Sequence, residues 1–194
     1  MKALWISAVI LSILITCFAV AAMIFVRVSN GAPACYVRDS GVFPDPICTP
    51  GVTNPKVTQA TIHQTICVRG WTSTIRPPEN VTEPEKLSSM AQYGDTTGPS
   101  NYEYDHFIPL ELGGAPNSLK NFWPEPHDVV LNGHNYGSFT KDDVENELRY
   151  QVCKGNLTLA QAQQIITSNW TQGLKYVYGG ATPPLTYTAK RKEK

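Results

Sequence analysis

The hydrophobic and polar positions divide this chain into one long apolar run and a mixed remainder. The apolar run covers residues 3–26. Four less apolar residues interrupt it: Ser7, Ser12, Thr16 and Cys17. About 20 apolar residues, at about 1.5 Å of rise each, are enough for a helix to cross a bilayer. The pattern therefore predicts a membrane anchor or a signal peptide at the start of the chain.

The charges beside the apolar run indicate its orientation. Lys2 and the amino terminus precede the run and Arg27 follows it, a slight bias that places the remainder of the chain outside the cytoplasm. Residues 32–34 read Ala-Pro-Ala, the small-x-small form of a signal-peptide cleavage site. The apolar core of a signal peptide usually has only about 7–15 residues. The longer run favours an uncleaved anchor, with a cleaved signal peptide as the alternative.

After the apolar run, the pattern predicts short elements joined by irregular chain. Residues 28–54 contain several Pro and Gly residues, which indicate a linker or an N-terminal lap. Apolar spacing in residues 58–67 predicts a short helix. Residues 71–75 alternate and are rich in β-forming side chains, so they are expected to form a strand. Residues 102–126 resemble a β-hairpin, and residues 129–139 are expected to form a polar loop.

Capping signals predict three longer helices. Thr82 and Glu85 have the spacing of a capping box, for a helix that ends at Gly94. Thr140 is expected to cap a helix over residues 141–153, closed by Gly155. Its buried stripe would contain Val144, Leu148 and Val152. A second capping box, Thr158 with Gln161, precedes a helix with four core-facing residues: Ala162, Ile165, Ile166 and Trp170.

These elements predict an α+β fold with short strands and no internal repeat. The expected organisation has four parts: residues 1–27 as signal anchor or signal peptide, 28–54 as linker or lap, 55–180 as the folded domain, and 181–194 as a flexible basic tail.

The cysteines support an exported domain. The chain has 5 cysteines, and Cys17 belongs to the apolar run. The other four, Cys35, Cys48, Cys67 and Cys153, are an even set and predict two disulfides, with three connectivities open. A zinc site is the alternative, but these residues include no Cys-x-x-Cys pair.

The charge is zero overall but unevenly distributed. The basic residues beside the apolar run and in the C-terminal tail leave residues 28–189 net acidic. A protein that binds nucleic acid through a broad basic face has the opposite profile. Any attraction for nucleic acid is therefore expected to come from a bound metal ion and a few placed cations.

One segment has the residue types of a hydrolytic site. Asp105 and His106 are adjacent at the end of the expected first strand, a Gly-Gly pair follows at 113–114, and Asn121 comes next. An aspartate can hold a divalent cation, a histidine can activate a water molecule, and an asparagine can fix the loop that presents them. On a regular strand Asp105 and His106 would face opposite sides, whereas a strand that ends or bulges there could aim both at one site.

The order Asp-His, Gly-Gly, Asn resembles the HNH, or His-Me finger, endonucleases, whose core is a ββα-metal hairpin and helix. The chain also looks like a group of small exported bacterial proteins, generally described as HNH-type endonucleases by similarity. The shared motifs are Cys-Thr-Pro-Gly at 48–51, Thr-Ile-Cys at 65–67, Ile-Arg-Pro-Pro at 75–78, Asp-His-x-Ile-Pro-Leu-Glu-Leu-Gly-Gly at 105–114, Trp-Pro-Glu-Pro at 123–126 and Lys-Asp-x-x-Glu-Asn at 141–146.

The resemblance implies a role for each matching residue. His106 would be the general base, Asn121 would brace the catalytic loop, and Asp105 would be a metal ligand. The last HNH position departs from the family, because the usual Cys-x-x-Cys-His signature is missing. His127 and Asn146 are the preferred replacements as metal ligand. The other candidates are Asn132, His134, Asn135 and Glu145.

The expected activity is hydrolysis of nucleic acid with low sequence specificity. Mg²⁺ is the expected cofactor, with Mn²⁺ or Zn²⁺ as alternatives, and no nucleotide cofactor is expected. DNA is the expected partner, with RNA as the alternative, and residues 3–26 would contact a membrane if uncleaved. Arg76 and Lys141 are candidate phosphate contacts. Arg76 could equally pair with a carboxylate, and a solvated lysine is the preferred interpretation of Lys141.

Two other functions fit the same residues. A non-catalytic exported binding or scaffold domain could keep the hairpin without the chemistry. A different metal-dependent hydrolase could act on the cell envelope, although the chain has no His-Glu-x-x-His signature of a zinc protease.

Overall fold

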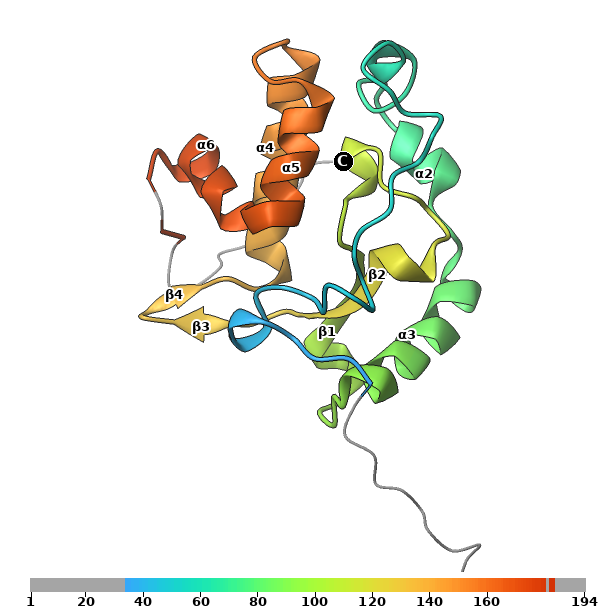
Figure 1. Cartoon of the computed structure of the whole chain (residues 1–194), viewed down its shortest axis with the longest axis vertical. Helices are drawn as coiled ribbons and strands as arrows, with labels where there is room; N and C mark the ends of the chain where they lie inside the picture. The colour runs from blue at the N-terminus through green and yellow to red at the C-terminus, as the bar shows by residue number, and fades with distance from the viewer. Residues whose placement is uncertain (1–33, 181, 184–194) are drawn as a thin grey trace, which may run out of the picture. The chain divides into compact units, whose positions relative to one another are not determined.

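The computed structural model describes residues 34–180, 182 and 183, which belong to the compact unit Pro33–Lys194 (Figure 1). This unit mixes helices with two small antiparallel sheets and contains two disulfides. Within the described residues, no helix combines the length and apolar character needed to cross a membrane. The anchor or signal segment expected at residues 3–26 and most of the expected basic tail lie outside the described residues.

The predicted hairpin is present as two antiparallel strands. Strand β1, Tyr102–His106, pairs with β2, Phe122–Pro126, and the register places Asp105 opposite Trp123 and His106 opposite Phe122. Because side chains alternate along a strand, the hairpin has two chemically different faces. Helix α4 packs against the face that carries Asp105, and α3 lies against the face that carries His106 (Figure 1).

The segment expected as a polar loop contains a second, very short hairpin. Strand β3, Val130–Leu131, pairs with β4, His134–Asn135. The two residues between them, Asn132 and Gly133, both have positive φ, 52° and 77°. This is the backbone of a two-residue hairpin turn, for which Asn-Gly is the preferred sequence. The prediction of a loop without strands was therefore wrong.

The expectations for residues 58–94 are partly corrected. Residues 58–67 contain only a 3₁₀ turn, Ile62–Gln64, in place of the expected helix. Residues 71–75 form helix α2, Trp71–Ile75, and the predicted strand is absent. Its β-forming side chains have no neighbouring strand to pair with, and pairing decides strand formation more than local preference does.

Helix α3 runs over Glu79–Tyr93 and begins earlier than the capping box predicts. Pro78 occupies the N-cap, so Thr82 and Glu85 lie inside the helix and form no capping box. Its C-terminus is as predicted. Gly94 has φ 72° and its N–H donates to the last free carbonyls of the helix.

The two C-terminal helices follow their sequence signals closely. Helix α4 covers Ser138–Cys153 and starts before the predicted cap, because Gly137 is the N-cap and the Thr140 hydroxyl instead donates to the Asn135 carbonyl. Its stripe of Val144, Leu148 and Val152 is fully buried, as predicted. Helix α5, Leu159–Asn169, has the predicted capping box, and α6, Leu174–Tyr178, follows a 3₁₀ turn.

Further 3₁₀ turns connect these elements, at Asp39–Gly41, Pro99–Asn101, Leu110–Leu112, Leu119–Asn121 and Trp170–Gly173. The core forms around the stripe of α4 and around Trp170, whose indole N–H donates to the carbonyl of Val42 in the N-terminal lap. The lap is therefore part of the folded unit rather than a free linker.

The disulfides join Cys35 to Cys48 and Cys67 to Cys153. This pairing settles which of the three connectivities holds. The second bridge ties the chain just before α2 to the last residue of α4, and such a cross-link contributes about 2–4 kcal/mol by restricting the unfolded chain. Two disulfides are consistent with a protein outside the cytoplasm.

Candidate functional site

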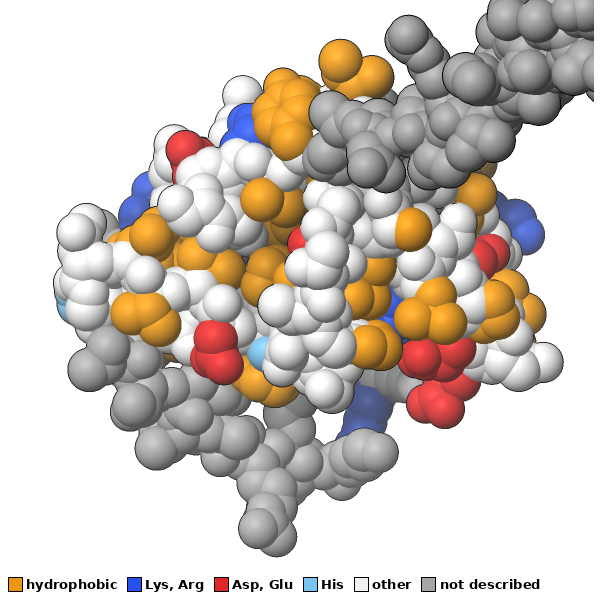
Figure 2. All heavy atoms as spheres, turned by 90° about the horizontal axis from the view of Figure 1, so that it is seen from below, with side chains coloured by type: hydrophobic (Ala, Val, Ile, Leu, Met, Phe, Trp, Pro, Cys, Tyr) orange, Lys and Arg blue, Asp and Glu red, His pale blue; other side chains and the backbone are white. Residues whose placement is uncertain are grey.

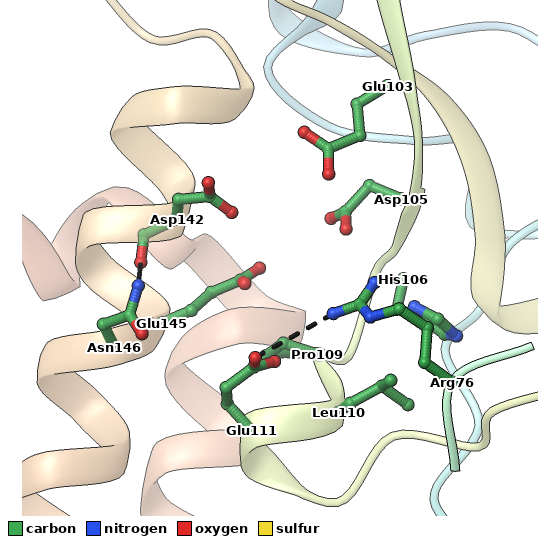
Figure 3. A pocket seen from close by; sticks show the side chains of 10 residues that line it. All are labelled: Arg76, Glu103, Asp105, His106, Pro109, Leu110, Glu111, Asp142, Glu145 and Asn146. Carbon is green, nitrogen blue, oxygen red and sulfur yellow. Dashed lines mark hydrogen bonds and ion pairs between the residues drawn. The ribbon is translucent and has the colours of Figure 1, made fainter. Parts of the chain in front are cut away.

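Asp105 and His106 lie on opposite faces of the hairpin, because β1 stays regular through its last residue. A pocket of about 210 Å³ opens at this end of the hairpin, and both side chains contribute to its lining (Figure 3). His106 also lines a second pocket of about 340 Å³ that lies between α3 and the strands. The histidine therefore stands at the rim between two adjoining pockets, whereas Asp105 belongs to the first.

His106 is held in one orientation and one tautomer. Its ring packs against Phe122, with centroids 4.0 Å apart, and Nε2 lies 3.1 Å from the Pro116 carbonyl oxygen. A carbonyl oxygen can only accept, so Nε2 carries the proton and donates. Nδ1 of the neutral ring is then an unprotonated acceptor, as a general base requires.

Burial lowers the pKa of His106 to about 4. Arg76 and Lys141 lower it further, while Asp105 and the bond to Pro116 oppose the shift. Because the ordinary value is about 6.5, the imidazole stays neutral throughout the physiological pH range.

Asn121 braces the loop that follows β1. Its side-chain oxygen accepts from the N–H groups of Ile108 and Val52, and its side-chain nitrogen donates to the carbonyls of Ile108 and Ala115. The side chain is fully buried. The hydrogen bonds expected of this residue are therefore present, and they tie the segment after His106 to the N-terminal lap.

The Gly-Gly pair permits this tight loop. A Cβ at Gly114 would lie 1.8 Å from the Ile108 carbonyl oxygen, and Gly113 adopts φ +77°. A Cβ at Gly113 would also lie 2.7 Å from the Val57 side chain, and a positive φ strains any residue with a Cβ. The Gly-Gly pair therefore lets the loop pack closely against Asn121, which is a structural reason for having glycine at both positions.

Carboxylates dominate the pocket beside Asp105. Figure 3 shows side chains from β1 and from α4 pointing toward one another across it. Its five acidic residues are Glu103, Asp105, Glu111, Asp142 and Glu145. Arg76 and Asn146 also line it. Sequence reasoning gave no role to Glu103 or Asp142, although Glu103 is two residues before Asp105 on a strand and Asp142 shares one helix face with Asn146.

Lys141 lies beneath this pocket rather than on the surface. Its ammonium contacts the carboxylates of Asp105 at 2.5 Å, Glu125 at 3.4 Å and Glu145, and its side chain is 1% exposed. The expectation of a solvated lysine was wrong, and so was that of a phosphate-binding Lys141, because a buried side chain cannot reach substrate. Ion pairs with the three carboxylates replace the hydration of the ammonium and stabilise its buried position.

The buried charges shift one another's pKa values. Burial opposes ionisation of Asp105, but Lys141 and His106 hold its pKa below the ordinary value. Burial raises the pKa of Glu125 and of Glu145 well above the usual range. Burial and the negative charges of Asp105 and Asp142 raise the pKa of Glu103 to about 7. The pKa of Asp105 is thus lowered beside Lys141, while burial shifts the pKa values of the neighbouring carboxyl groups in the opposite direction.

The two preferred positions for the last metal ligand lie in different places. Asn146 lines the same pocket as Asp105, and its side-chain nitrogen donates to the Asp142 carbonyl, so the amide oxygen is its remaining acceptor. His127 is absent from the residues that line this pocket. Its Nδ1 lies 2.9 Å from the Ser138 hydroxyl and its ring stacks on Phe139. The structure therefore brings Asn146, and not His127, together with Asp105.

The other candidate ligands divide in the same way. Glu145 lines the pocket, whereas Asn132, His134 and Asn135 belong to the β3–β4 hairpin and are absent from its lining. Within residues 34–180 and 182–183, no three His, Cys, Asp or Glu side chains are grouped closely enough to form a metal cage.

The donors in the pocket nevertheless fit Mg²⁺ in chemical type. They are carboxylate and amide oxygens, which Mg²⁺ prefers, and this ion usually keeps several waters and needs only one or two carboxylates from the protein. Asp105 and Asn146 would hold such an ion, with Glu145 and Asp142 beside them. The oxygen-only set fits Zn²⁺ less well, because zinc sites use mainly nitrogen and sulfur ligands.

Arg76 follows α2 and faces both pockets. Its guanidinium lies 4.0 Å from Glu111 and the side chain is half exposed, so the ion pair leaves it accessible (Figure 3). The position suits contact with a phosphate beside His106, which stays a prediction.

Comparison of the chain with protein-family models, with curated proteins and with solved structures gives no match.

Proposed function

We propose that this protein is an extracytoplasmic, divalent-metal-dependent endonuclease of the HNH type. The observation that carries the proposal is the environment of His106, a buried neutral imidazole whose Nε2 is committed to a carbonyl and whose Nδ1 is left to accept a proton. The order hairpin β1–β2, then helix α4, supports assigning a ββα-metal core to this unit.

The convergence of distant motifs supports the same function. Arg76, Asp105 and Asn146 come from three separate motifs of the resemblance, yet all line one pocket. Glu125 of a fourth motif joins the network beneath it. Segments about 70 residues apart in sequence would have no reason to gather charged groups at one place if each motif served only local folding.

Each residue of the site would have a separate role in phosphodiester hydrolysis. Nδ1 of His106 accepts the proton of the attacking water. Arg76 binds a non-bridging phosphate oxygen and orients the substrate. A divalent ion on Asp105 and Asn146 would supply charge neutralisation at the phosphate and at the leaving oxygen. Asn121 keeps the loop after His106 fixed during the reaction.

The charge distribution on one face of the molecule supports the expectation of low sequence specificity. Figure 2 shows one face on which Lys and Arg side chains are scattered among acidic and apolar ones, with no broad basic patch. Sequence readout needs an element that enters a groove and contacts base edges. No motif that reads base edges was recognised in the sequence, so contacts to the sugar-phosphate backbone are expected to dominate.

Cleavage of supercoiled plasmid and of RNA by the oxidised full-length protein tests the proposal. Nicking is expected with Mg²⁺ or Mn²⁺ and is expected to stop with EDTA. The matched comparison is His106→Ala beside His63→Ala, because His63 lies on an exposed turn and does not line the pocket. Cleavage that survives His106→Ala, or no cleavage of either nucleic acid by folded metal-loaded protein, would contradict it.

A non-catalytic binding domain is the alternative that one observation favours. Lys141 already neutralises Asp105, the first expected metal ligand. If that pair excluded divalent ions altogether, the hairpin would keep its shape without the chemistry. Absence of any Mn²⁺ binding to the folded protein, together with absence of cleavage, would favour this function.

A further inference from the structure

Lys141 is a cation buried among groups of the proposed active site. Its side chain is 1% exposed, and it projects from the first turns of α4 toward the hairpin. Burial of an unpaired ammonium is strongly unfavourable, so its position must be determined by its partners.

Those partners come from three elements. The ammonium donates to Asp105 of β1 at 2.5 Å, to the main-chain carbonyl of His106 at 3.3 Å, and to Glu145 one turn along α4. The carboxylate of Glu125 in β2 lies 3.4 Å away. The three donated hydrogen bonds use the full capacity of the ammonium.

Two of these contacts are to the residues that do the chemistry. One holds a carboxylate oxygen of Asp105, the proposed metal ligand, and the other holds the backbone of His106, the proposed base. Movement of the ammonium would therefore displace both groups. In contrast, Lys141 lies outside the set of residues that line the pocket, so it has no direct contact with substrate.

The charges around Lys141 explain what it contributes. Without it, Asp105, Glu125 and Glu145 would be three buried carboxylates around an empty centre. Such a set either holds protons or binds a cation tightly. A covalently attached ammonium supplies the neutralising charge permanently, whether or not a metal ion is present.

We propose that Lys141 is a positioning residue that acts as a built-in counter-cation, keeping Asp105 and His106 in place in the metal-free protein and limiting the pocket to one weakly bound divalent ion. This inference rests on the proposed function for the roles of Asp105 and His106. Its effect on cation binding is independent of catalysis and is measured without nucleic acid.

Lys141→Met tests the inference, because methionine replaces most of the lysine stem and removes the charge. An ammonium repels a divalent ion bound nearby, so removal of its charge is expected to strengthen divalent-ion binding. The variant is therefore expected to bind Mn²⁺ at least about tenfold more tightly than the wild type, by calorimetry in the absence of nucleic acid. Cleavage at saturating Mn²⁺ is expected to fall by at least about tenfold, because Asp105 and His106 lose their shared anchor.

If Lys141→Met does not fold, a double variant still tests the inference. Lys141→Met with Glu125→Gln removes one buried carboxylate together with the cation and leaves Asp105 and Glu145 unchanged. It is expected to keep the tighter Mn²⁺ binding. The matched control is Glu125→Gln alone, which retains Lys141, lies outside the pocket lining, and is expected to bind Mn²⁺ as the wild type does.

The outcomes separate this inference from the proposed nuclease activity. Unchanged Mn²⁺ affinity in a folded Lys141→Met or double variant would overturn the inference, even if the wild type cleaves nucleic acid, and Lys141 would then be a structural ion-pair residue only. Tighter Mn²⁺ binding with no cleavage by the wild type would support the counter-cation and contradict the nuclease.

Discussion

The two faces of the β1–β2 hairpin provide different environments for adjacent residues. On one face, Glu103 and Asp105 meet α4 in a network of buried charges around Lys141. On the other face, the rings of Tyr104, His106 and Phe122 pack together, and a single hydrogen bond fixes the histidine. The alternation of one strand thus separates a charged environment from an aromatic one.

The difference shows how one strand can set the charge states of two adjacent side chains by different means. The charged face keeps Asp105 ionised by supplying a cation, while the aromatic face keeps His106 neutral by removing water. Two adjacent residues are therefore both kept deprotonated, one by a neighbouring cation and the other by burial.

Replacing His106 is expected to have the largest effect. His106→Ala removes the proposed base and should lower the rate of plasmid cleavage by about 10²–10⁴-fold, the range typical of general-base catalysis. The folded state should persist, because the charged face is untouched. Cleavage rates and circular dichroism measured beside His63→Ala check this. An equal loss in both variants would show that the effect is not specific to the site.

Replacing Asn121, which braces the loop after β1, is expected to have the second largest effect. Asn121→Ala leaves the buried amide and carbonyl groups of Ile108 without partners, and each unsatisfied group costs about 1–3 kcal/mol. The free energy of unfolding should fall by about 3 kcal/mol in urea titrations of oxidised protein. Asn121→Asp is the matched variant, since it keeps the acceptor oxygen but places a second oxygen against the Ile108 and Ala115 carbonyls, so it is expected to be at least as destabilising. A fall below about 1 kcal/mol for Asn121→Ala would contradict the bracing role.

The pH dependence of stability should differ in sign between the two faces. The folded pKa of His106, about 4, is below its ordinary value, so the unfolded state binds more protons between about pH 4 and 6.5 and stability is lost as pH falls. The folded pKa of Glu103, about 7, is above its ordinary value, so its contribution is present at low pH and is lost as pH rises toward 7.

The opposite pH dependences of stability can be measured separately in EDTA, which removes bound metal ions. Over pH 4.5–6.5 each group contributes about 2 kcal/mol after allowance for solvent screening. His106→Asn should make stability fall more steeply with rising pH than in the wild type, and Glu103→Gln should make it rise. Urea titrations at several pH values measure both. Parallel curves for the two variants would refute the assignment of opposite shifts.

Weakening the aromatic face is expected to have the smallest effect. Tyr104 stacks on Phe122 with ring centroids 4.5 Å apart, and such a pair contributes about 0.5–1.5 kcal/mol beyond its burial. Tyr104→Leu should therefore lower the free energy of unfolding by about 1 kcal/mol and change cleavage less than about threefold. Tyr36→Leu is the control, because Tyr36 is 57% exposed. A larger loss of cleavage would mean that Tyr104 contacts substrate.

Much of the fold around this site follows from local sequence signals. The hairpin, the buried stripe of α4 and the capping box of α5 were predicted because each depends on residues close together in the chain. The strand expected at residues 71–75 was wrong, since a strand needs a partner and local preference cannot supply one. The Asn132–Gly133 pair is the preferred sequence of a two-residue hairpin turn, so the β3–β4 hairpin was predictable from the sequence.

The site was predictable in its residue types and not in its electrostatics. Asp105 and Asn146 were expected ligands and do line one pocket. The burial of Lys141 could not be predicted, because it depends on carboxylates from β1 and β2 that only the folded chain brings to α4. His127 was chosen from its spacing to a motif, and spacing along the chain does not report which pocket a side chain enters.

The Cys67–Cys153 bridge can form only late in synthesis, after the second cysteine has been made. Its two cysteines are 86 residues apart, and the hairpin and most of α4 lie between them. The Cys35–Cys48 bridge, spanning 13 residues, can close while the chain is still emerging. An oxidant acting on the nascent chain would therefore meet first a species with one bridge, and the covalent link at the end of α4 would be added last, to a chain in which both strands have already been made.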